Sequence, residues 1–105
     1  MVREVTPAEF VAGREAGSAA VLLDVREAWE VCASAAPGST HIPMAELPGR
    51  LAELDPARPV VVLCRSGVRS LQVAQFLERR GFTDVANLAG GILQWSQFDP
   101  SIRAY

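Results

Sequence analysis

The sequence predicts an α/β fold, with a central parallel five-stranded sheet covered by helices on both faces. Apolar, strand-like segments alternate along the chain with segments whose apolar residues recur at helical spacing, which is typical of parallel sheets. Two strand-like segments, Ala19–Leu23 and Val60–Leu63, are continuous apolar runs, as expected of strands buried on both faces. The chain has 105 residues, half of them hydrophobic, which suits one domain spanning residues 1–105 with its own core.

Capping residues, glycines and prolines set the expected boundaries. Thr6, Pro7 and Glu9 have the pattern of a capping box at the start of the first helix. The expected strands span residues 2–5, 19–23, 39–42, 60–63 and 84–88. The expected helices span residues 7–15, 28–33, 47–54 and 68–80, with a last one opened by Gly90-Gly91 and holding Trp95. We expect the residues from Asp99 onward to be loosely attached.

Composition and charge exclude several classes of protein. The formal net charge of -2 argues against nucleic-acid binding, which needs a basic face. No apolar run approaches the roughly 20 residues of a membrane span, and the N-terminus lacks the apolar core of a signal peptide. Two cysteines in a domain of this size do not make a disulfide framework. We therefore expect a cytoplasmic protein with reduced thiols, without membrane or nucleic-acid partners.

The segment from Val60 to Ser70 is the expected centre of the chemistry. Cys64 follows an apolar run, Gly67 and two arginines come next, and a helical pattern follows. A strand that passes through a short loop into a helix surrounds the cysteine sulfur with backbone N–H groups, which suits a thiolate or a bound anion. A buried, unreactive cysteine is the alternative, but the position at the end of a strand before Gly67 favours the reactive interpretation.

Four short motifs follow one another along the chain. They are Asp24-Val25-Arg26-Glu27, then Pro37-Gly38 with His41-Ile42-Pro43, then Cys64-Arg65-Ser66-Gly67-Val68-Arg69-Ser70, and finally Asn87-Leu88 with Gly90-Gly91 and Trp95. These motifs, in this order, resemble those of the rhodanese family, in its small single-domain form. The chain departs from the family at Ser34-Ala35-Ala36, where a Gly-His-Ile segment is common. We interpret Ala35 in place of the usual histidine as a structural variation, because the loop chemistry does not need that side chain.

This resemblance implies a rhodanese-like fold and a sulfurtransferase. The Cys64 thiolate would take a sulfane sulfur from thiosulfate or a persulfide donor, hold it as a persulfide, and pass it to a thiophilic acceptor. No metal and no organic cofactor is required. Ping-pong kinetics should follow.

The loop residues are the expected substrate-binding residues: Arg65, Ser66, Gly67, Val68, Arg69 and Ser70. Their backbone N–H groups can form an anion-binding nest, and Gly67 allows the backbone angles of a tight loop. Arg65 and Arg69 would form a positive rim that favours a small anionic donor such as thiosulfate.

Other candidate residues have weaker signals. Asp24 and Arg26 end a strand, and the resemblance implies that they buttress the loop by hydrogen bonds and an ion pair; a purely structural role is the alternative. His41 is expected to be structural or on the surface, and Trp29 belongs either to the rim of the site or to the core. For Cys32 a structural role is favoured over that of a resolving thiol.

Loop length separates sulfur transfer from a competing chemistry. Cysteine-dependent phosphatases carry Cys-x5-Arg, whereas Cys64 and Arg69 form Cys-x4-Arg, a ring better sized for sulfur than for a phosphoryl group. This difference places phosphatase or arsenate-reductase activity below sulfur transfer.

Two further alternatives remain. One is a relay domain that exchanges persulfide sulfur with a sulfur-carrier protein in cofactor or thionucleoside biosynthesis, and the other is an inert interaction module. Inactive family members usually lose the cysteine, so Cys64 argues against the last.

Overall fold

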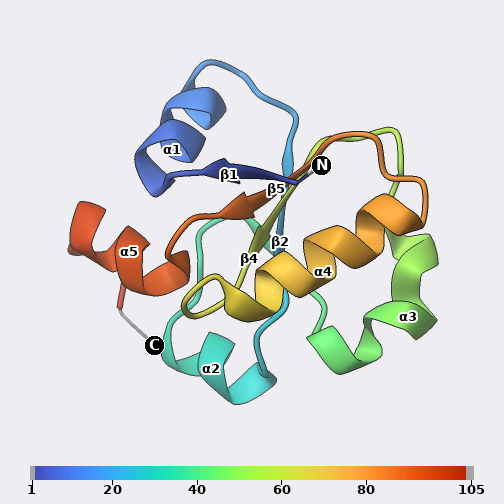
Figure 1. Cartoon of the computed structure of the whole chain (residues 1–105). Coiled ribbons are helices and arrows are strands. Elements are labelled where there is room, and N and C mark those ends of the chain that lie inside the picture. The colour runs from blue at the N-terminus through green and yellow to red at the C-terminus, as the bar shows by residue number, and fades with distance from the viewer. Residues whose placement is uncertain (1, 104–105) are drawn as a thin grey trace.

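The computed structural model describes residues 2–103 and contains one parallel sheet (Figure 1). Its strands are β1 (Arg3–Val5), β2 (Val21–Asp24), β3 (Ser39–His41), β4 (Val60–Leu63) and β5 (Val85–Leu88). Every neighbouring pair is parallel, and the order across the sheet is β1-β5-β4-β2-β3. The predicted five-stranded parallel sheet is thus confirmed, with the strand that precedes Cys64 at its centre.

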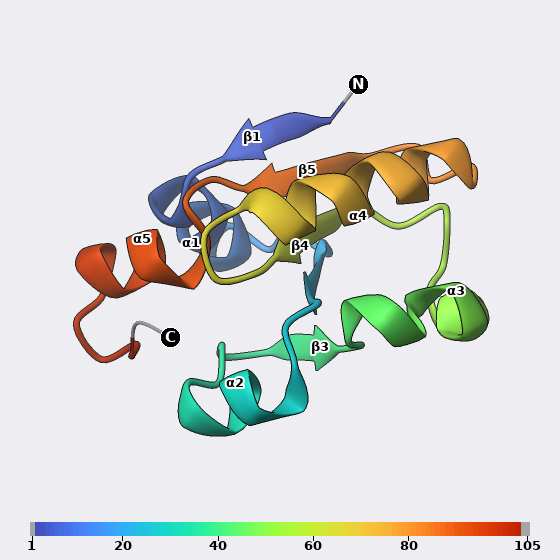
Figure 2. The ribbon, with the colours of Figure 1, turned by 60° about the horizontal axis from the view of Figure 1, so that its bottom comes forward.

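Helices cover both faces of the sheet, also as predicted. They are α1 (Pro7–Glu15), α2 (Ala28–Ala33), α3 (Leu47–Arg50), α4 (Val68–Arg79) and α5 (Gly91–Phe98). Alternate side chains of β4 enter two different hydrophobic clusters: Val62 packs with Val73 and Leu77 of α4, whereas Val61 packs with Ile92 of α5. Figure 2 shows α1 beside α5, and α4 running along β4 and β5.

The capping box at the start of α1 is confirmed. The Glu9 backbone N–H donates to Thr6 Oγ1 at 3.1 Å, and the Thr6 N–H donates to Glu9 Oε1 at 2.9 Å. Two of the exposed N–H groups at this helix end are therefore satisfied by side chains.

The expectation of one helix over residues 47–54 is wrong. Two 3-10 turns, Met44–Glu46 and Leu51–Glu53, flank the single turn of α3. Pro48 is tolerated only in the first turn of a helix because it has no N–H to donate, and Gly49 weakens the helical backbone. The leucine spacing predicted burial correctly for Leu47 but not a continuous helix.

The chain after α5 is also better attached than expected. Ile102 is buried in the cluster shared by α1 and α5, and the Ser34 hydroxyl donates to the Arg103 carbonyl. The expectation of a loose tail is therefore wrong as far as residue 103, and residues 104 and 105 lie outside the described residues. Between residues 2 and 103, no helix has both the length and the apolar composition needed to cross a bilayer.

Candidate active site

Cys64 lies directly after the central strand and at the start of the loop that leads into α4. Its side chain is buried. Its Sγ accepts a hydrogen bond from the Gly67 backbone N–H at 3.0 Å and lies 3.2 Å from Ser70 Oγ. Gly67 has a φ of +99° and caps α4, a backbone conformation that favours glycine. The structure thus brings Cys64, Gly67 and Ser70 together at the N-terminus of α4, where a negative charge is favoured.

The N-terminus of α5 supports the loop through two backbone hydrogen bonds. The Ile92 N–H donates to the Cys64 carbonyl at 2.9 Å, and the Leu93 N–H donates to the Arg65 carbonyl at 3.1 Å. A Cβ on Gly91 would lie 2.5 Å from both carbonyl oxygens, so only glycine fits there. Because a trans peptide places its N–H opposite its C=O, these bonds turn the N–H groups of Arg65 and Ser66 away from α5.

Arg69 forms an ion pair with Glu30, a residue that the sequence interpretation did not single out. Arg69 Nη1 and Nη2 donate to Glu30 Oε1 and Oε2, both at 2.8 Å. The Glu30 side chain is only 4% exposed and that of Arg69 is 33% exposed. Glu30 is the single acidic residue in the otherwise apolar α2, a signal that could have identified it as a buried charged partner.

The hydrogen bonds from Arg69 lower the pKa of the Glu30 carboxyl, against the effect of burial, and the Glu27 N–H and the charge of Arg26 add to the lowering. The same bonds raise the pKa of Arg69. The charge of Arg69 is therefore compensated by Glu30. Arg65, by contrast, is exposed and forms no ion pair within residues 2–103. Of the two arginines expected at the rim, Arg65 is the one whose charge is uncompensated.

Asp24 and Arg26 form a second ion pair, and both side chains are fully buried. Arg26 Nη2 donates to Asp24 Oδ2 at 2.7 Å and to the Ser34 carbonyl at 2.6 Å. Ser34 is the C-terminal cap of α2, so this pair joins β2 to the end of that helix. The charge of Arg26 also helps to lower the pKa of Glu30, the partner of Arg69.

The remaining candidate residues take structural or surface positions. His41 Nε2 lies 2.7 Å from the Arg26 carbonyl, consistent with a structural role. Trp29 is 61% exposed and therefore does not belong to the core, and Val68 is 65% exposed. Cys32 is a free, exposed thiol.

The segment that departs from the family pattern also has a structural role. Ala35, in the position of the usual histidine, is exposed, whereas Ala36 is buried against the α1 and α5 cluster. Ser34, which precedes Ala35, accepts a hydrogen bond from Arg26 at its carbonyl and donates one from its hydroxyl to the Arg103 carbonyl.

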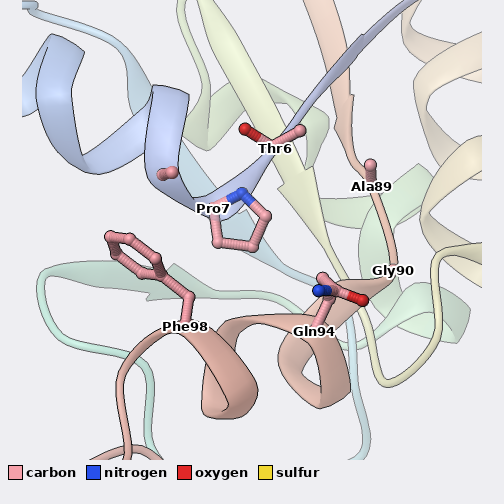
Figure 3. Close-up of a pocket in the computed structure, with 7 residues that line it drawn as sticks. Thr6, Pro7, Ala89, Gly90, Gln94 and Phe98 are labelled. Carbon is pink, nitrogen blue, oxygen red and sulfur yellow. The ribbon is translucent and has the colours of Figure 1, made fainter.

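A pocket of about 310 Å³ lies between the start of α1 and α5 (Figure 3). It is lined by Thr6, Pro7, Ala8, Ala89, Gly90, Gln94 and Phe98. None of the predicted site residues lines this pocket.

Metal-ligand clusters are a separate question. Within the described residues, no group of three His, Cys, Asp or Glu side chains lies close enough together to hold a metal ion.

The fold, together with a buried cysteine at a strand-to-helix loop, defines a rhodanese-type domain. The family model described as "Rhodanese-like domain" matches residues 6–98, and the chain belongs to this family. It is 38% identical over 98 residues to a protein named "Sulfurtransferase" from Allochromatium vinosum, covering 92% of this chain and 91% of that protein. It is 34% identical over 93 residues to the "Thiosulfate sulfurtransferase GlpE" of Pseudomonas savastanoi, covering 89% and 86%.

The solved structures agree with this assignment. A rhodanese-like domain protein from Staphylococcus aureus superposes with a TM-score of 0.87 at 26% identity, covering 99% of both chains. The predicted rhodanese-like fold is therefore confirmed over the described residues.

Proposed function

We propose that this protein is a sulfurtransferase that carries a sulfane sulfur on Cys64. The observation that carries the proposal is the position of Cys64 Sγ, which accepts the Gly67 N–H at 3.0 Å at the N-terminus of α4. Backbone donors and the helix dipole stabilise negative charge at this point. Relatives of similar length that are named sulfurtransferases support the same chemistry.

In the first step, the Cys64 thiolate attacks the outer sulfur of thiosulfate. A bond forms between the two sulfurs, the bond between the outer sulfur and the sulfonate sulfur breaks, and sulfite leaves with that electron pair. The exposed Arg65 would attract the dianionic donor. A persulfide with a negative outer sulfur remains on Cys64, within reach of the N–H groups of the loop.

In the second step, a thiophilic acceptor such as cyanide or a thiolate attacks the outer sulfur, and Cys64 leaves as the thiolate. Only sulfur bonds form and break, so the reaction needs no metal and no organic cofactor. Donor and acceptor use the same site in turn, and parallel double-reciprocal plots are expected.

Substitution of the two cysteines tests this proposal. Cys64→Ser should abolish transfer of sulfur from thiosulfate to cyanide, while Cys32→Ser, which alters an exposed thiol in α2, should retain it. Unchanged activity in Cys64→Ser would refute the proposal.

A second candidate is a relay domain that exchanges persulfide sulfur with a sulfur-carrier protein. The observation that favours it is the exposure of two large apolar side chains, Val68 at the start of α4 and Trp29 in α2, since exposed apolar residues favour protein contacts. Turnover with thiosulfate and with a protein persulfide distinguishes the two functions. A strong preference for thiosulfate would contradict the relay.

A cysteine-dependent phosphatase or arsenate reductase is the least supported function. The ring from Cys64 to Arg69 is one residue shorter than that chemistry uses, and Arg69 is bound to Glu30.

We also propose a cytoplasmic location. Both described cysteines are free, which agrees with a reducing compartment.

A further inference from the structure

A chain of hydrogen bonds runs from Glu4 on β1 to the Cys64 sulfur. Asn87 Nδ2 on β5 donates to the Glu4 carboxylate at 3.1 Å and to the Gly67 carbonyl at 3.1 Å. Asn87 Oδ1 accepts the Ser70 hydroxyl, and Ser70 Oγ lies 3.2 Å from Cys64 Sγ. Glu4 stands directly opposite Asn87 in the pairing of β1 with β5, so the sheet register holds the two side chains together.

Glu4 and the Gly67 carbonyl fix the orientation of the Asn87 amide. Both are acceptors, and each receives one of the two amide hydrogens. If the amide were flipped, Asn87 Oδ1 would face two acceptors without a hydrogen between them. Asn87 therefore presents its oxygen, and not its nitrogen, to the Ser70 hydroxyl.

This orientation determines what Ser70 can do for the sulfur. The hydroxyl has a single proton, and that proton is given to Asn87 Oδ1. Ser70 can then only accept a hydrogen bond from Cys64, so it stabilises the thiol form. To stabilise a thiolate, Ser70 would have to turn its proton to the sulfur and leave Asn87 Oδ1 unpaired in a buried position, since both residues are buried.

We propose that Glu4 is a positioning residue that controls the pH at which Cys64 becomes a nucleophile. The negative charge on Glu4 strengthens the Asn87 amide as an acceptor, and the amide in turn retains the proton of Ser70. Glu4 is exposed, so its charge can be removed without burying a new group. The inference rests on Cys64 being the reacting residue, as proposed above.

Several other charged groups belong to the elements around this sulfur, and they stay constant in the test. On the loop and α4 these are Arg65 and Arg69, of which Arg69 interacts electrostatically with Cys64. On α2 and its cap they are Glu30 and Glu27, both of which act on Arg69. After β2, Arg26 is paired with Asp24, and its charge acts on Glu30.

The rate of Cys64 alkylation by iodoacetamide, measured against pH, tests the proposal. The variants carry Cys32→Ser so that Cys64 is the only thiol, and thermal unfolding confirms that each is folded. Glu4→Gln should move the midpoint of the alkylation profile to lower pH by roughly half a unit, about a threefold faster reaction below the midpoint. Glu15→Gln, at an exposed residue of α1, controls for the loss of one negative charge and should leave the midpoint unchanged.

The same substitution in a Ser70→Ala background identifies the route of the effect. If Glu4 acts through Ser70, Glu4→Gln should not move the profile of the Ser70→Ala protein. An equal shift in both backgrounds would show that Glu4 acts by a direct field effect, and it would overturn the proposal. With Ser70 present, the absence of a shift or a shift to higher pH would overturn it as well. Alkylation needs no sulfur donor, so failure here is distinct from failure of the sulfurtransferase proposal, which Cys64→Ser tests.

Discussion

The Glu30 carboxylate and the Arg69 guanidinium form two hydrogen bonds of 2.8 Å that join α2 to the first turn of α4. Arg69 is the residue immediately before Ser70, whose hydroxyl lies beside the Cys64 sulfur. The ion pair therefore positions the C-terminal half of the loop. Because Glu30 compensates the charge of Arg69, it also leaves Arg65 as the cation most available to an anionic donor.

Glu30→Gln should destabilise the protein in a pH-dependent way. Arg69 lowers the folded-state pKa of Glu30 below the usual 4.5, so the stabilisation is fully present above that value and is lost as the pH falls through the folded-state pKa. The expected loss near neutral pH is about 1–2 kcal/mol, less than for a fully buried pair because Arg69 is partly exposed. Urea denaturation at several pH values measures it. A difference between the two proteins that grows as the pH falls below 4 would contradict the assignment.

Arg65→Gln should slow the reaction with thiosulfate, because the anionic donor would be attracted to the site less strongly. We expect kcat/KM for thiosulfate to fall about three- to tenfold and to depend less on ionic strength, because an exposed cation acts by long-range attraction that salt screens. Stopped-flow measurement of sulfite release at several salt concentrations tests this. An unchanged salt dependence would show that Arg65 does not guide the donor. Arg14→Gln, at an exposed arginine on α1, is the matched control.

Gly91→Ala should disrupt the support of the loop by α5. The added Cβ would lie 2.5 Å from the carbonyl oxygens of Cys64 and Arg65, and the φ of +61° is unfavourable for alanine. We expect a loss of about 3 kcal/mol or more in the free energy of unfolding. Gly49→Ala adds a Cβ with no atom within 4 Å and should be neutral or slightly stabilising. Equal stability of the two variants would contradict this account.

Asp24→Asn should cost more than the loss of an exposed ion pair. It removes the carboxylate that neutralises Arg26 in a fully buried site, and breaking such pairs costs about 3–5 kcal/mol. The matched control is Asp84→Asn, which breaks a solvent-exposed pair with Arg3 and should have a smaller effect. Chemical denaturation of both variants gives the comparison, and similar losses would count against a structural role for the buried pair.

The sequence predicted most of the fold because its signals were local. The apolar run before Cys64 and the alternation of segments predicted a parallel sheet, and the capping box at Thr6 and Glu9 placed the start of α1. The region around Pro48 and Gly49 was mispredicted as one helix because the leucine spacing was weighted above two residues that interrupt helices. The burial of Ile102 depends on contacts distant in sequence, which no local pattern reports.

The candidate site was predictable where it lies within one segment, from Cys64 to Ser70. Its partners from elsewhere were not. Glu30 meets Arg69 because the fold brings α2 to the start of α4. Glu4 meets Asn87 because β1 pairs with β5 in one register. Asn87 belonged to a family motif, but its role beside Ser70 depends on the same packing.

Mass spectrometry of the protein after treatment with thiosulfate tests the central claim most directly. We expect the intact mass to increase by one sulfur atom, with one sulfite released per chain. Peptide mapping should place that sulfur on Cys64, cyanide should remove it, and Cys32→Ser should behave in the same way. A protein that gains no sulfur, or gains it only on Cys32, would contradict the assignment of Cys64 as the sulfur carrier.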